Sequence, residues 1–141
     1  MCEATRLRHT NMDWTQLTLL LGRLLLGGYF VHAGYSHFRN RKMMAGYAAS
    51  KGVPFAMPAI LATGALLALG GLSLLTGYLP LVGIALLAVF LVGVTPKMHD
   101  FWTVKDPMAR MGERVNFLKN TALLGAVLML SAIATPWAYT L

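Results

Sequence analysis

The chain has 141 residues, of which 57% are hydrophobic and 12% are charged, and its mean hydropathy is +0.60. Soluble domains are nearer half apolar and a quarter charged, so this composition argues against water as the only solvent. The net charge of +7 does not indicate nucleic-acid binding, because the basic residues lie in two loops between long apolar runs without interleaved aromatic residues. Anionic lipid headgroups are the simpler partner for these loops.

The apolar runs predict four helices in one domain, after a polar segment at residues 1–13 in which Met12 is a candidate for the true start. A helix needs about 20 apolar residues to cross a bilayer core. The predicted helices cover about residues 15–38, 57–77, 80–98 and 115–138. The predicted fold class is therefore an all-α membrane protein, with a four-transmembrane-helix bundle over residues 14–141.

Two other interpretations of the apolar runs fit less well. The first run is too long for a cleavable signal peptide, and no small-residue cleavage site follows it. A soluble bundle needs polar helix faces, and the second run carries no charge at all. Lipid is therefore the expected surroundings of the helices.

The distribution of Lys and Arg predicts the orientation. The two loops after the first and third predicted helices, with Lys119 just inside the fourth, hold nine basic residues. The opposite side holds two, Arg6 and Arg8. Since short cytoplasmic loops are enriched in Lys and Arg, we expect the basic loops in the cytoplasm and both termini on the outer side. Trp14, Tyr78, Trp137 and Tyr139 would then form the outer aromatic belt.

Small residues predict where the helices meet. Helices in lipid associate by close backbone approach, which glycine permits. The glycines expected at such contacts are Gly27, Gly34, Gly70, Gly77 and Gly125.

Arg23 is the most unusual residue of the first predicted helix, because a charged group inside a bilayer is costly. One interpretation is that its guanidinium reaches the outer headgroups. No carboxylate lies in any predicted span to pair with it. If Arg23 instead points inward, an anionic or carbonyl-bearing ligand, or a neighbouring subunit, would be its partner.

Histidines mark the other end of the predicted bundle. His37 and His99 lie at cytoplasmic helix ends, and Asp100 follows His99, so these groups could hold a metal ion or relay protons. His32 lies about 180° around the helix from Arg23 and could pair with a second histidine on haem. The spacing matches no metal motif, so we predict no metal site, and haem is disfavoured.

Several segments in order resemble the DoxX family of small four-helix bacterial membrane proteins. The strongest match is the segment FLKNTALLG at residues 117–125, which contains Lys119 and Asn120. Others are Leu21–Leu24 (LGRL), Gly70-Gly71 and the segment His99–Trp102 (HDFW). The resemblance implies a bacterial inner-membrane protein whose relatives are associated with quinol oxidase or thiosulfate:quinone oxidoreductase subunits. Many members carry a glutamate in the second helix where this chain has Leu67, which puts any mechanism through that carboxylate in doubt.

These observations favour a membrane subunit that supports quinone-linked electron transfer without its own redox centre. The lone cysteine, Cys2, excludes a thiol oxidoreductase that needs cysteine pairs, and no arrangement typical of an autonomous enzyme is present. The alternatives are a homo-oligomeric anion carrier or pore lined by Arg23, and a structural assembly factor. The candidates for contact with a quinone or another ligand are Arg23, His32, His37, His99, Asp100, Lys119 and Asn120.

Overall fold

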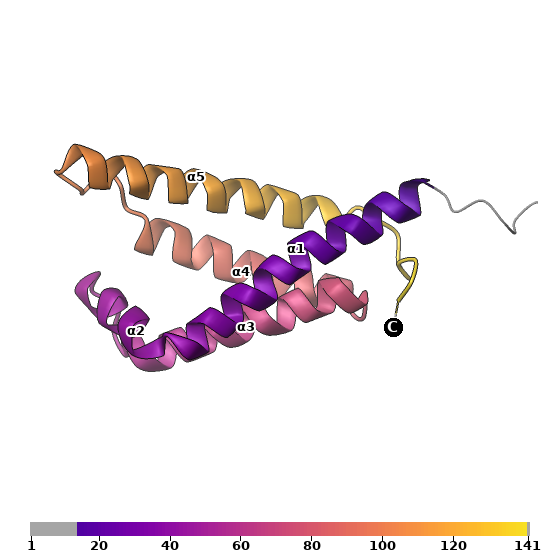
Figure 1. Ribbon diagram of the computed structural model, residues 1–141, viewed down its shortest axis with the longest axis horizontal. Coiled ribbons are helices and arrows are strands. Elements are labelled where there is room, and N and C mark those ends of the chain that lie inside the picture. The colour runs from indigo at the N-terminus through magenta and orange to yellow at the C-terminus, as the bar shows by residue number, and fades with distance from the viewer. Residues whose placement is uncertain (1–13, 141) are drawn as a thin grey trace, which may run out of the picture.

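The computed structural model describes residues 14–140, and all regular secondary structure in that range is helical (Figure 1). The four long helices are α1 (Trp14–Arg39), α3 (Ala56–Thr76), α4 (Pro80–Met98) and α5 (Pro107–Leu130). A shorter helix, α2 (Arg41–Ser50), connects α1 to the turn before α3. The polar segment 1–13, with Met12, Arg6 and Arg8, lies outside the described residues.

The first, second and third predicted helices agree with α1, α3 and α4 to within one residue at each end. The fourth was misplaced: α5 begins at Pro107 and ends at Leu130, whereas the apolar run had indicated about 115–138. Asp106 explains the early start, because its side chain accepts a hydrogen bond of 2.7 Å from the backbone N–H of Ala109 and so caps the first turn. Pro107 follows at the first helical position, where no N–H is needed.

The helices form a row in which each long helix contacts the next (Figure 1). α1 lies along α3, α3 along α4 and α4 along α5, while α2 packs against α3. Leu67, Leu74, Leu87 and Leu91 are buried where these helices meet, together with Phe30 of α1. The start of α1 and the end of the described chain lie at one end of the molecule, and α2 lies at the other (Figure 1).

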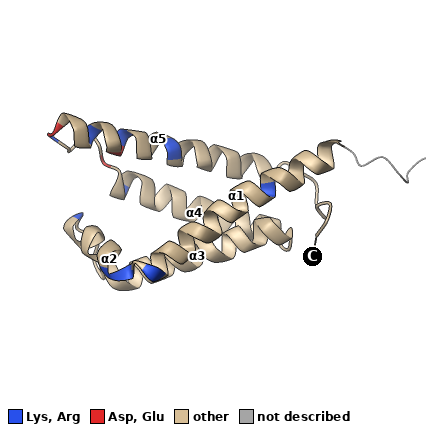
Figure 2. Cartoon of the chain, in the orientation of Figure 1, with Lys and Arg blue, Asp and Glu red and all other residues tan. Residues whose placement is uncertain are grey.

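Three helices in the described range, α1, α3 and α4, are long and apolar enough to cross a membrane. α5 is also long but does not meet the same criterion, and it carries Arg110, Glu113 and Arg114 in its first half and Lys119 at its middle. The charged residues gather toward the end that holds α2 (Figure 2). Arg23 is an exception, because it lies in the first half of α1, away from that end. We call this charged end the basic end.

Glycines bring α1 and α3 into close contact. A Cβ on Gly27 would lie 2.9 Å from the carbonyl oxygen of Gly71, and one on Gly34 would lie 2.9 Å from that of Gly64. Real Cβ atoms do not approach backbone so closely, so both positions on α1 require glycine. Gly70 serves α4 in the same way, because a Cβ there would lie 2.6 Å from Leu87.

Gly125 does not belong to this group. A Cβ at that position would meet nothing within 4 Å, so the expected helix contact at Gly125 is absent from the described chain. The small residues of α5 are therefore not needed for its contact with α4 at this point.

Candidate functional site

Arg23 is completely buried and bonded to backbone carbonyls. Its Nε donates to the carbonyl oxygen of Leu74 at 2.9 Å, and its Nη2 donates to that of Leu75 at 2.9 Å. Its Nη1 donates to Ala138 at 2.6 Å, and Nη2 also reaches Tyr139 at 3.5 Å. The guanidinium thus joins the end of α3 to the segment after α5.

The chemistry of these acceptors explains why a cation is needed. The last carbonyls of a helix have no intrahelical partner, and Leu74 and Leu75 lie in the last turn of α3. Non-helical backbone at membrane depth must also find donors within the protein, and residues 131–140 contain no helix. Arg23 supplies donors to both, so its partners account for its burial without a headgroup or a ligand.

Gly77 and Trp137 shape the space around this guanidinium. Gly77 ends α3 with a φ of 74°, and a Cβ there would lie 2.7 Å from the Nη2 of Arg23. The Trp137 ring lies on another side, with its centroid 5.5 Å from the Arg23 Cζ. Trp137 is 3% exposed, so its expected place in the outer aromatic belt was wrong. It covers the arginine instead.

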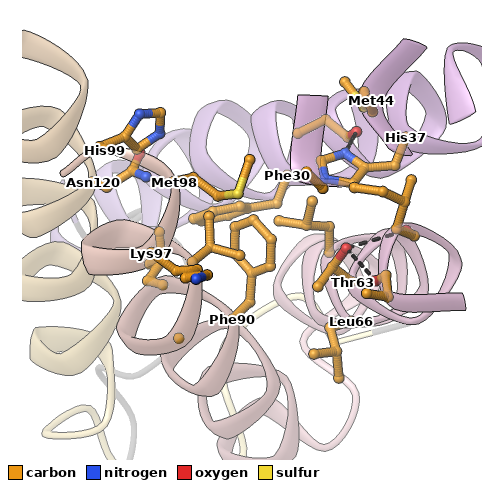
Figure 3. Close-up of a pocket in the computed structure, with 18 of the residues that line it drawn as sticks. Phe30, His37, Met44, Thr63, Leu66, Phe90, Lys97, Met98, His99 and Asn120 are labelled. Atoms are coloured by element: carbon orange, nitrogen blue, oxygen red, sulfur yellow. Dashed lines mark hydrogen bonds between the residues drawn. The ribbon is translucent and has the colours of Figure 1, made fainter. Parts of the chain in front are cut away.

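A cavity of about 880 Å³ lies nearer the basic end and receives side chains from all five helices (Figure 3). Its wall is mainly apolar, with Phe30, Leu67, Phe90 and Leu123 among its residues. The polar groups at the wall are Tyr29, His37, Tyr47, Thr63, Lys97, His99, Lys119 and Asn120. Cavities of this size and composition are typical of sites for small organic ligands.

His37 reaches the cavity from α1 with one ring nitrogen already used. Its Nδ1 lies 2.9 Å from the carbonyl oxygen of Ala33, which can only accept, so Nδ1 carries a proton. Nε2 has no partner among residues 14–140. The His37 ring packs edge-on against the Phe90 ring, with 6.0 Å between the ring centroids. Gly64 makes room for His37, since a Cβ on Gly64 would lie 2.9 Å from the His37 Cβ.

Asn120 reaches the same cavity from α5 (Figure 3). The residue is only 8% exposed, yet its side-chain amide forms no hydrogen bond within the described part of the chain. Its polar atoms are not fully enclosed by the protein, so they open to the cavity, where a ligand or water can pair with them. Lys119 beside it is exposed and donates to the Oδ1 of Asn116 at 3.1 Å.

His99 belongs to a hydrogen-bonded cluster that also includes Glu113 and Tyr47. The His99 Nδ1 lies 2.8 Å from one oxygen of Glu113, and the Tyr47 hydroxyl donates to the other oxygen at 2.8 Å. Both carboxylate oxygens of Glu113 are therefore already bonded within the protein.

Asp100 is bonded outside the cavity wall. Its carboxylate accepts from the Lys51 ammonium at 2.5 Å and from the Thr103 hydroxyl at 2.8 Å. The hydrogen bond from Lys51 lowers the pKa of Asp100, and the same bond raises the pKa of Lys51. This pair fastens the end of α2 to the segment after α4.

The structure thus brings four of the predicted ligand residues to one cavity: His37, His99, Lys119 and Asn120. Arg23 and His32 do not line it, and His32 is exposed on α1. Within residues 14–140, no group of three or more metal-ligating side chains is placed to hold a metal ion. Three residues at or beside the cavity, Tyr47, Lys97 and Glu113, were not predicted. Nothing in the spacing indicated that α2, which carries Tyr47, packs against α3, and the two charged residues looked like the other charges of the basic loops.

A family model for DoxX matches residues 18–100, which is more than half of the chain. The chain belongs to the DoxX family. The match to DoxX includes α1 to α4 and stops before α5, so the segment 117–125 on which the resemblance most depended lies outside it. Comparisons with curated proteins and with solved structures found no match. Membership in the DoxX family and the three apolar helices make this a membrane protein.

Proposed function

We propose that this DoxX protein is a membrane subunit that binds a lipid-soluble quinone and supports a quinone-linked redox complex without a redox centre of its own. One observation carries the proposal. The apolar cavity is lined by an amide on α5 and an imidazole nitrogen on α1, neither of which has a partner within residues 14–140.

The chemistry of a quinone fits these two groups. A quinone ring is apolar at its faces and carries carbonyl oxygens at opposite edges. The N–H groups of Asn120 would donate to one of these oxygens. Neutral His37 offers a lone pair at Nε2, which accepts from the hydroxyl of the reduced quinol. Protonated His37 donates to the oxidised form instead, so the same side chain serves both states.

Electrons would pass between the bound ligand and a partner subunit, because the chain contains only one cysteine and no thiol pair. The exposed cations at the basic end, among them Arg39, Arg41 and Lys42, offer a surface for anionic headgroups or an acidic partner.

The proposal places the protein in a bacterial inner membrane with four crossings, α5 being the fourth. The basic loops would face the cytoplasm, and both termini would lie on the outer side. Support comes from the charges gathered at one end of the row of helices (Figure 2) and from the two described chain ends at the other (Figure 1). A C-terminal tag that only cytosolic reagents reach would overturn this orientation.

Extraction of ligand from the purified protein tests the function. Protein purified in mild detergent should retain quinone, and Asn120→Leu and His37→Phe should each retain less. Thr121→Val is the matched control, since Thr121 is exposed next to Asn120 and bonds only to the carbonyl oxygen of Phe117. If the wild-type protein holds no quinone, or if all variants hold equal amounts, the proposed binding site is wrong.

A further inference from the structure

The cavity wall carries positive charge that nothing in the described chain balances. Lys97 on α4 and Lys119 on α5 both line it, and no Asp or Glu does. Lys97 has no hydrogen bond or ion pair within residues 14–140, and its ammonium lies 3.8 Å from where a Cβ of Gly52 would be. Lys119 bonds only to the neutral amide of Asn116.

The nearest carboxylates are already bonded to other groups. One carboxylate oxygen of Glu113 accepts a hydrogen bond from Tyr47 of α2. The other accepts from His99, the residue after α4. Asp100 is bonded to Lys51 and Thr103. The other polar side chains of α1 at the wall, Tyr29 and His37, are not carboxylates. A neutral occupant would therefore leave both ammonium groups without a counter-charge.

We propose that this cavity binds an amphiphile whose head is an anionic oxygen group and whose tail is hydrocarbon. The head would lie against Lys97, Lys119 and the free amide of Asn120. The tail would lie along the apolar wall, which includes Phe30, Leu67 and Phe90. The inference rests on the proposed function, because it assigns a charge to the ligand of the same cavity.

Two sources supply this chemistry, and both present the same kind of head. One is the enolate of a hydroxylated quinone, and the other is a long-chain carboxylate from the membrane. Charge-assisted hydrogen bonds are roughly twice as strong as neutral ones. Both lysines are exposed, so screening keeps the gain modest, and we expect an affinity ratio of about tenfold between an anion and its neutral analogue.

Matched ligand pairs test the inference. The first pair is a 2-hydroxy-3-alkyl-1,4-naphthoquinone at pH 8 and its 2-methoxy ether. The second pair is palmitate and hexadecanol. Affinities are measured by calorimetry on the full chain in mild detergent, at low and high salt. In the wild-type protein the anion of at least one pair should bind about tenfold tighter than its analogue, and salt should reduce the ratio.

The variants identify the source of the preference. In Lys97→Gln/Lys119→Gln the ratio should fall to about two or below, whereas Lys97→Arg/Lys119→Arg should keep it. Lys42→Gln/Lys105→Gln removes two exposed cations away from the cavity and should not change it. If Lys97→Arg/Lys119→Arg keeps the affinity ratio between the anion and its neutral analogue, then substitution at positions 97 and 119 is compatible with folding.

The outcomes separate this inference from the proposed function. Equal affinity within both pairs, or a preference that survives loss of both lysines, overturns the anionic head. If the naphthoquinones bind but show no preference, the quinone proposal stands alone. If only palmitate binds and prefers its charged form, the anionic site stands and the quinone assignment fails.

Discussion

Replacement of Arg23 should destabilise the end of the molecule opposite the basic end, and the expected loss of stability follows from the hydrogen bonds of Arg23. Three of its contacts to carbonyl oxygens are 2.9 Å or shorter. A hydrogen bond to a charged group contributes about 1.5–3 kcal/mol, so three give roughly 4.5–9 kcal/mol before the cost of burying the guanidinium is subtracted. Arg23→Met removes that cost but leaves the carbonyls without donors. We expect a net loss of about 3 kcal/mol, or about 6–12 °C in Tm.

The assay is the fraction of protein that remains monodisperse by size-exclusion chromatography after heating in mild detergent. Arg23→Lys keeps the charge but loses the planar fork of donors, so its Tm should lie between those of the wild type and Arg23→Met. Lys42→Met, at an exposed position of the basic end, is the control and should leave Tm unchanged.

A double-mutant cycle decides whether the C-terminal segment is the partner. Removal of residues 134–141 takes away the carbonyls of Ala138 and Tyr139 together with Trp137. The truncation should cost about 1–3 kcal/mol less in the Arg23→Met background than in the wild type, because the partner is already gone. Strict additivity of the two changes would refute the reasoning.

Three further changes test the helix contacts and the His99 cluster. Gly77→Ala should destabilise the protein by about 1–3 kcal/mol, because Gly77 has a positive φ and an added Cβ would clash with the Arg23 guanidinium. Gly28→Ala is the control and should not lower Tm, because an added Cβ there would lie in open space. Gly34→Ala should lower Tm and Gly125→Ala should not, because only Gly34 touches a facing backbone. Glu113 accepts hydrogen bonds from Tyr47 of α2 and from His99, the residue after α4, so Glu113→Ala should lower Tm by removing both acceptors. An unchanged Tm would contradict a structural role for this cluster.

The helices that the sequence predicted well are those in which the apolar run and the helix coincide. α1, α3 and α4 are bounded by prolines, glycine or basic residues at the points where hydrophobicity ends. α5 was misplaced because hydrophobicity continues through residues 131–138 after the helix stops, and because the helix begins at the cap Asp106-Pro107, within a charged stretch that precedes the apolar run. Hydrophobic run length alone does not distinguish a helix from an apolar segment of turns and irregular backbone.

The site was only partly predictable for a different reason. His37 and Asn120 stood out as polar residues within or beside apolar runs, and both line the cavity. The partners of Arg23 are backbone carbonyls 51 to 116 residues away along the chain, and backbone acceptors leave no mark in a sequence. α2 was missed because its basic and small residues were taken for a loop, and with it the contact between Tyr47 and Glu113.

The bonds of Arg23 also set an order on biosynthesis. Ala138 and Tyr139 lie 115 and 116 residues after Arg23 along the chain, so the ribosome makes them much later. Until they arrive, the guanidinium has only the acceptors of α3 available and must stay near water or phosphate to satisfy its remaining donors. The final seating of α1 therefore follows the synthesis of residues 138–139, and a chain cut before them would leave this guanidinium only partly bonded.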